Sequence, residues 1–124
     1  MKISICIDVS SKQVAIPFYT QALGFEFVNE NDEYVQLSAN GQTIYLGEKS
    51  QGSNPLIEGE AVRNFDRHWT PVHLDISVDD ITKCIGQILK LGGKVEGEKN
   101  GDWGSIAFCA DPFGNGFCIM QLNE

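Results

Sequence analysis

Two segments of the chain, residues 2–9 and 72–78, alternate between apolar residues and residues that carry a hydroxyl, thiol, imidazole or carboxylate. Two later segments place a tyrosine and a cysteine between apolar neighbours in the same way. The polar positions of this pattern are Ser4, Cys6, Tyr45, His73, Asp75 and Cys118. Because successive side chains of a strand point to opposite faces, we expect all six to face one concavity and their apolar neighbours to face the helices. This set can orient a small organic ligand, but it lacks the donors of a catalytic divalent metal site.

Three of these side chains allow both a structural and a functional interpretation. His73 is either hydrogen-bonded to a neighbouring hydroxyl or a metal ligand. Cys118 is either a buried apolar residue or a thiolate activated by His73. Asp75 requires a partner, because an unpaired buried carboxylate is costly. His73, Ser77 or water would supply that partner, and a cationic ligand is the alternative.

Two tryptophans lie beside the second alternating segment. Trp69 comes just before it, and Trp103 precedes a later apolar run. They are predicted either to form flat aromatic walls for a planar ligand or to pack as ordinary hydrophobic residues. His68, next to Trp69, is expected to be a solvated linker residue.

Composition limits the class of protein. The chain has 124 residues, of which 42% are hydrophobic and 21% charged, as expected for one globular domain. The net charge of −8 disfavours nucleic acid as a partner. The same charge suits a cationic ligand, or solubility alone. No apolar run reaches the roughly 18 residues that a membrane span needs.

The four cysteines form no CxxC pair, and the first residues do not resemble a signal peptide. We therefore expect free thiols and a cytoplasmic protein. The cysteines are Cys6, Cys84, Cys109 and Cys118.

The same order of elements occurs twice. Each alternating segment is followed by an amphipathic stretch and then by three short extended runs, which predicts β-α-β-β-β in duplicate. The first module spans about residues 1–48 and the second about 72–124, within a single domain of 1–124. Residues 49–71, rich in glycine and proline, are predicted to be a linker and a candidate flap.

Both predicted helices end at glycine. In the second, an apolar stripe follows a capping aspartate and consists of Ile81, Cys84, Ile85, Ile88 and Leu89. In the first, the stripe consists of Val14, Phe18, Tyr19 and Ala22. Pro17 is tolerated only in a first turn, so we expect this helix to begin near Ala15.

Four stretches, in their order and spacing, carry a specific resemblance. They are Phe18–Tyr19, Leu23–Gly24–Phe25, Val72–Val78, and Asp111–Asn115 with the strand that follows it. Together they resemble the glyoxalase, bleomycin resistance and extradiol dioxygenase proteins, the vicinal oxygen chelate superfamily. The resemblance implies an α+β fold of two tandem βαβββ modules whose curved mixed sheets form a cup. It also implies a homodimer whose cup is completed by both chains.

Metal-dependent members of this superfamily carry histidine, glutamine or glutamate near the start of the first strand and in the last strand of each module. The resemblance places Ser4, Tyr45, His73 and Cys118 at those four positions. Only His73 is an expected ligand, so we predict no bound metal and no cofactor.

Three functions remain open. The first is a metal-free protein that binds a drug or metabolite without changing it. The second is a glyoxalase- or dioxygenase-like enzyme with an unusual ligand set. The third is an interaction module whose cup is filled by its own side chains. Open sheet edges favour a homodimer with an interface above about 1,000 Å².

Overall fold

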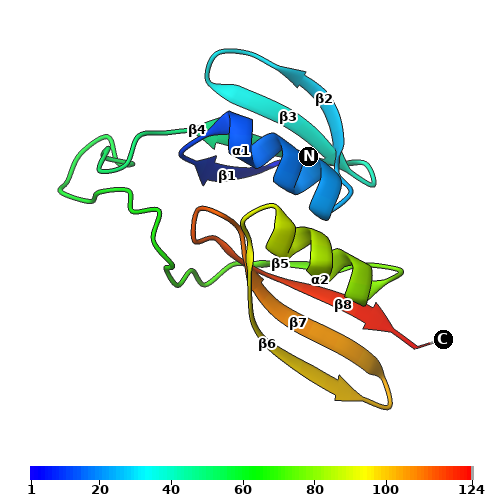
Figure 1. The fold of residues 1–124 in the computed structure, drawn as a ribbon. Coiled ribbons are helices and arrows are strands. Elements are labelled where there is room, and N and C mark those ends of the chain that lie inside the picture. Colours follow the sequence, from blue (N-terminus) through cyan, green and yellow to red (C-terminus); the bar gives the residue numbers. More distant parts are fainter. Residues whose placement is uncertain (124) are drawn as a thin grey trace.

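The computed structural model describes residues 1–123, which form two four-stranded sheets with a helix each (Figure 1). The first module contains β1 (Ile5–Val9), α1 (Lys12–Pro17), the π-helical turn η1 (Phe18–Ala22), β2 (Glu26–Glu30), β3 (Tyr34–Ala39) and β4 (Gln42–Glu48). The second contains β5 (Leu74–Ser77), α2 (Ile81–Lys90), β6 (Lys94–Gly101), β7 (Gly104–Ala110) and β8 (Gly116–Leu122). This arrangement confirms the predicted α+β fold of two βαβββ modules. Residue 124, the last of the predicted second module, lies outside the described residues.

The two sheets share one topology. Their strand orders are β1-β4-β3-β2 and β5-β8-β7-β6, and in each the first strand of the module pairs in parallel with the last. The other pairs are antiparallel, so both sheets are mixed and open. β1 and β5 are therefore edge strands. Within residues 1–123, no strand of one module pairs with a strand of the other.

The helices lie between the two sheets, and η1 packs on α2 (Figure 1). The apolar residues of the alternating strands face this space, where Val9, Ile44 and Ile119 are at most 2% exposed. Phe18 of η1 meets Phe117 of β8 edge-on, with ring centroids 6.0 Å apart. One hydrophobic core therefore joins the two modules.

The first helix differs from the sequence prediction. It begins at Lys12 rather than near Ala15, because the Ser11 hydroxyl caps it by accepting the Val14 N–H at 3.3 Å. Pro17 therefore falls at the end of α1, where it cannot donate a backbone hydrogen bond. The chain widens there into η1, and the Thr20 hydroxyl donates to the Ile16 carbonyl at 2.7 Å. The proline thus sets where the α-helix changes to a π-helical turn.

The apolar stripes are narrower than predicted. In α2 the Asp80 carboxylate accepts from the Lys83 N–H at 3.0 Å as a cap, and Cys84 and Ile88 are buried. Leu89, expected in the stripe, is 56% exposed, and Val14 of α1 is 46% exposed. Both lie at the margin of the face that contacts the sheets, so only the centre of each stripe enters the core.

The turn between β7 and β8 connects the modules through a buried carboxylate. Asp111 is 3% exposed and accepts the Tyr19 hydroxyl of η1 at 2.6 Å. It also accepts the backbone N–H groups of Phe113 and Asn115, at 2.8 and 2.9 Å. The Asn115 amide donates both to Asp111, at 2.8 Å, and to the Asp8 carbonyl of β1, at 3.0 Å. The predicted turn is therefore also a joint between the modules.

The linker of residues 49–73 reaches away from both modules before it returns (Figure 1). Arg63 fixes it to β1 through an ion pair with Asp8, with Nε and Oδ2 2.7 Å apart. Phe65 packs edge-on against Phe113, with centroids 6.4 Å apart. The linker thus touches both modules.

The Tyr19 hydroxyl is expected to be a main source of stability. Tyr19→Phe removes a charge-assisted bond to a buried carboxylate and should lower the free energy of unfolding by about 1.5–3 kcal/mol. Tyr34→Phe, on the face of sheet one that points away from the helices, is the matched control and should cost less than about 0.5 kcal/mol. Urea denaturation measures both, and equal losses would contradict the assigned role.

Candidate functional site

The polar side of each alternating strand lies on the sheet face opposite the helices. Cys6 of β1 is the cross-strand partner of Tyr45 of β4, and Asp75 of β5 is the partner of Cys118 of β8. The expected concavity is therefore divided within one chain. Cys6 and Tyr45 belong to the first sheet, with Ser4 just before β1, and Asp75 and Cys118 belong to the second, with His73 just before β5. The division arises because β1 and β5 do not pair with each other.

The second sheet gathers three reactive side chains. The His73 Nε2 and Asp75 Oδ1 atoms are 3.0 Å apart, and these side chains are 50% and 56% exposed. One ligand atom from each of His73, Asp75 and Cys118 lies within 4.8 Å of the others. Asp75 was expected to be buried and is exposed, so its carboxylate does not require a partner, but it lies against His73, one of the alternatives raised by the sequence.

The thiol of Cys118 is poorly suited to nucleophilic attack. Its pKa is raised above the ordinary value, first by burial and then by the negative charge of Asp75, to which the thiol also donates a hydrogen bond. An activated cysteine needs the opposite change, a lowered pKa. This favours Cys118 as a protonated thiol that holds the Asp75 side chain.

The first sheet presents a different group. Ser4 precedes β1 and is exposed, while Tyr45 meets Tyr34 edge-on with centroids 6.3 Å apart. Gly47 leaves room for this arrangement, since a Cβ there would lie 3.3 Å from the Tyr34 ring and 3.5 Å from the Cys6 sulfur. Tyr34 was not among the predicted site residues, although its position opposite β4 would follow from the hairpin register.

The two predicted tryptophans have different surroundings. Trp69 is 82% exposed and borders a small cavity of about 200 Å³ on the polar face of the second sheet, together with His73, Phe108 and Cys118. Trp103 lies in the turn between β6 and β7, over Gly101, and lines neither this cavity nor the larger one described next. Only Trp69 stands beside the other predicted residues.

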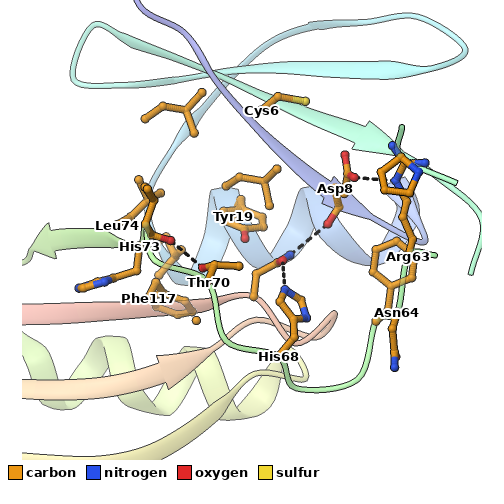
Figure 2. A pocket seen from close by; sticks show the side chains of 18 of the residues that line it. Cys6, Asp8, Tyr19, Arg63, Asn64, His68, Thr70, His73, Leu74 and Phe117 are labelled. Carbon is orange, nitrogen blue, oxygen red and sulfur yellow. Dashed lines mark hydrogen bonds and ion pairs between the residues drawn. The ribbon is translucent and has the colours of Figure 1, made fainter. Parts of the chain in front are cut away.

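A larger cavity, of about 600 Å³, lies between the modules (Figure 2). Its apolar walls come from the edge strands β1 and β5, from β8 and from the residue after η1, and they are formed by Ile5, Ile7, Leu23, Leu74, Ile76 and Phe117. Cys6 and His73 stand at its border, one from each module. The cavity thus opens on the side of the strands that was expected to be covered by helices. It exists because α1 and α2 leave the edges of β1 and β5 half-buried.

The polar lining of this cavity comes mainly from the linker, which sequence analysis did not select. Arg63 binds Asp8, and the Thr70 hydroxyl donates to the Val72 carbonyl at 2.7 Å. His68, expected to be solvated, is instead hydrogen-bonded to Asn115 (Figure 2). Sequence spacing could not reveal Arg63 and His68, because each acts through a contact with a distant segment.

Comparison with known proteins identifies the class. Residues 4–120 match the glyoxalase-like domain, and the chain belongs to that family, within the vicinal oxygen chelate superfamily. Over 124 residues it is 31% identical to a probable lactoylglutathione lyase of Vibrio cholerae serotype O1, covering 95% of this chain and 88% of the relative. Over 109 residues it is 30% identical to a probable chloroplastic lactoylglutathione lyase of Arabidopsis thaliana, covering 86% of this chain but 31% of that longer relative.

Solved structures show the same fold. The fosfomycin resistance protein FosX of Listeria monocytogenes superposes with a TM-score of 0.73 at 13% identity, covering 99% of this chain and 93% of FosX. No helix within residues 1–123 is both long enough and apolar enough to cross a membrane.

The residues present do not match the metal site that the superfamily implies. Ser4 and Tyr45 are neutral oxygen donors, and the fourth position holds Cys118 with a raised pKa in place of a carboxylate. His73 is already paired with Asp75. Divalent ions in open catalytic sites take three or more imidazole, carboxylate or thiolate ligands. These four positions therefore do not fit the superfamily's ion.

Exposure predicts which thiols react, because burial raises the pKa of all four cysteines and only Cys6 is exposed. At about pH 8, iodoacetamide should label the exposed Cys6 and spare Cys118 and Cys109, since burial raises the pKa of Cys109 to about 12. Asp75→Asn removes a negative charge beside Cys118, so its pKa should fall and its labelling near pH 9 should rise by up to about tenfold. Asp79→Asn is the control, and peptide mass spectrometry is the measurement. Labelling of Cys118 as fast as Cys6 in the unmodified chain would contradict this.

Proposed function

We propose that the protein binds a small organic ligand without a resident metal ion, sequestering a drug or metabolite. The observation that supports this most directly is the substitution of the superfamily's ligand set by Ser4, Tyr45, His73 and Cys118, with Cys118 protonated and His73 paired. The groups that remain can donate and accept hydrogen bonds to an organic molecule. None of them carries an unpaired charge suited to a hard cation.

The polar face of the second sheet is the centre of this proposed site. Trp69 and Phe108 offer flat apolar surfaces, and His73 lies with them around the smaller cavity. Half of the His73 side chain remains exposed, so its imidazole is accessible to a ligand. An aromatic wall with one polar orienting group is a common arrangement for planar ligands.

We propose that a second copy of the chain completes the site. The edges of β1 and β5 offer unpaired backbone groups, and Ile5 and Leu74 are only half-buried beside the larger cavity. If β1 of one chain lies along β5 of its partner, a twofold arrangement covers both edges at once. Because both polar faces point away from the helices, Cys6 of one chain would then share a surface with His73 of the other. The six predicted residues would form one concavity across the dimer.

The expected environment is the cytoplasm. All four cysteines are free, and a reducing compartment keeps them so. The net charge of −8 gives no support for a nucleic-acid partner.

A second function, a glyoxalase- or dioxygenase-like enzyme with a non-standard ligand set, is favoured by one observation. His73, Asp75 and Cys118 bring three donor atoms within 4.8 Å, and the two curated relatives are probable lactoylglutathione lyases. Metal analysis of the purified protein separates the two functions. A stoichiometric ion that is lost in both His73→Ala and Cys118→Ser, but kept in Cys6→Ser, would establish the enzyme-like site.

The ligand-binding proposal predicts different roles for the two tryptophans. A thermal-shift screen of cationic, planar and thiol-containing compounds on chelator-treated protein should find a stabilising compound. Trp69→Ala should weaken its binding by about fivefold or more, since aromatic contacts of this kind contribute about 1 kcal/mol or more. Trp103→Ala, which alters the turn outside both cavities, should leave affinity unchanged. Binding only after metal is restored would contradict the proposal.

The dimer is predicted to depend on the edge-strand surface. Sedimentation at micromolar concentration should give a dimer with an interface above about 1,000 Å². Val72→Lys places a charge at a residue that is 77% exposed beside β5 and should shift the protein toward monomer. Val28→Lys, at a residue 48% exposed on the far edge of the first sheet, should not. A monomeric wild-type chain would exclude this assembly.

A further inference from the structure

Both ring nitrogens of His68 face hydrogen-bond acceptors. Nδ1 lies 2.9 Å from the Asp66 backbone carbonyl oxygen. Nε2 lies 3.1 Å from Oδ1 of Asn115, a contact drawn as a dashed line from His68 in Figure 2. A carbonyl oxygen can only accept. The first contact therefore requires a proton on Nδ1.

The orientation of the Asn115 amide is fixed by its other partners. Its nitrogen donates to the Asp8 carbonyl at 3.0 Å and to the Asp111 carboxylate at 2.8 Å, and both of these atoms are acceptors. Turning the amide over would place its oxygen against both of them. Oδ1 must therefore face His68, so the second contact requires a proton on Nε2.

A neutral imidazole has one N–H and one lone pair, whereas an imidazolium has two N–H groups. Only the protonated ring can donate to Asp66 and Asn115 together. In the neutral ring, one nitrogen lone pair points at an oxygen lone pair. The geometry around His68 is thus complementary to the imidazolium.

Charged groups lie near His68. Asp66 and Arg67 precede it in the linker, and Asn115, which contacts its ring, is hydrogen-bonded to the backbone carbonyl of Asp8 and to the carboxylate of Asp111. Arg67 is paired with Glu96 of β6, and Arg63 with Asp8. The pKa of Arg67 is raised, first by its hydrogen bond to Glu96 and also by the negative charge of Asp111. Tyr19 donates to Asp111 as a neutral hydroxyl, since burial and the Asp111 charge raise its pKa well above the usual value.

The segment that carries His68 is seated tightly on the second module. The His68 N–H donates to the Gly114 carbonyl at 3.4 Å. Gly114 has φ +82°, and a Cβ there would lie 2.2 Å from the Asp66 oxygen. The next residues, Trp69 and Thr70, line the small cavity beside His73. Arg67 also holds this segment, through the Gly114 carbonyl at 3.4 Å and the ion pair with Glu96, so His68 is one of several contacts that position these two residues.

We propose that His68 is a proton-dependent latch, which fastens linker residues 65–70 to the Asp111–Asn115 turn when its ring is protonated. As pH falls, both hydrogen bonds form and the linker closes onto the second module. As pH rises, the neutral ring loses one of them and the segment opens more often. The latch concerns the protein's own linker, so it stands whether or not the proposed ligand is correct.

Amide hydrogen exchange of the full chain tests this, with rates corrected for the intrinsic pH dependence. In the wild type, protection of residues 65–70 should fall roughly fivefold to tenfold from about pH 5.5 to about pH 8, the factor expected for one net hydrogen bond. His68→Gln cannot titrate and should remove this dependence. The chain has two histidines, so His73→Gln is the matched control and should retain it. Unchanged protection in β8 would show that each variant is folded.

Three results would overturn the latch: no pH response in the wild type, a response that persists in His68→Gln, or one that disappears in His73→Gln. A measurement on the unmodified protein decides the matter if a variant does not fold. Nitrogen-15 spectra of the His68 ring at about pH 5.5 should show protons on both nitrogens in the folded chain. A single ring N–H at that pH would also exclude the latch.

Discussion

A buried carboxylate must be surrounded by donors, and the structure is arranged around that requirement at Asp111. The donors come from separate parts of the chain: the Tyr19 hydroxyl from η1, and backbone and side-chain groups from the turn itself. Removing any one leaves a desolvated charge partly unpaired, which costs more than the bond itself contributes. Because Asn115 then extends from Asp111 to the backbone of β1, this one charge fixes the distance between modules whose sheets do not pair.

The fold could be predicted from the sequence, whereas the joint between its halves could not. Apolar and polar residues alternate in residues 2–9 and 72–78 and again around Tyr45 and Cys118, and this alternation indicates which face of each sheet is buried. The burial of Ile44 and Ile119 follows from it. Pro17 had predicted that the first helix begins near Ala15, but the capping hydrogen bond of Ser11 makes it begin at Lys12. The Arg63–Asp8 and Asn115–Asp8 contacts join residues 55 and 107 positions apart, and no periodic pattern contains such information.

The candidate site shows the same limit. Sequence reasoning selected His73, Asp75 and Cys118, and the structure brings them together. Membership in the glyoxalase-like family supplies a scaffold that relatives use for different purposes, so the chemistry must be read from these side chains. Burial, followed by the negative charge of Asp75, raises the pKa of Cys118, and the His73 imidazole remains accessible beside an exposed indole.

The sheet topology has a consequence for how the chain folds during synthesis. All strand pairs of the first sheet join residues 5–48, and those of the second join residues 74–122. Each sheet can therefore assemble from sequence-local partners, which favours rapid formation. Tyr19, however, finds its acceptor 92 residues later, in the turn between β7 and β8. The first module is therefore synthesised before the acceptor of the Tyr19 hydroxyl, and the two halves can dock through this bond only after β7 has been made.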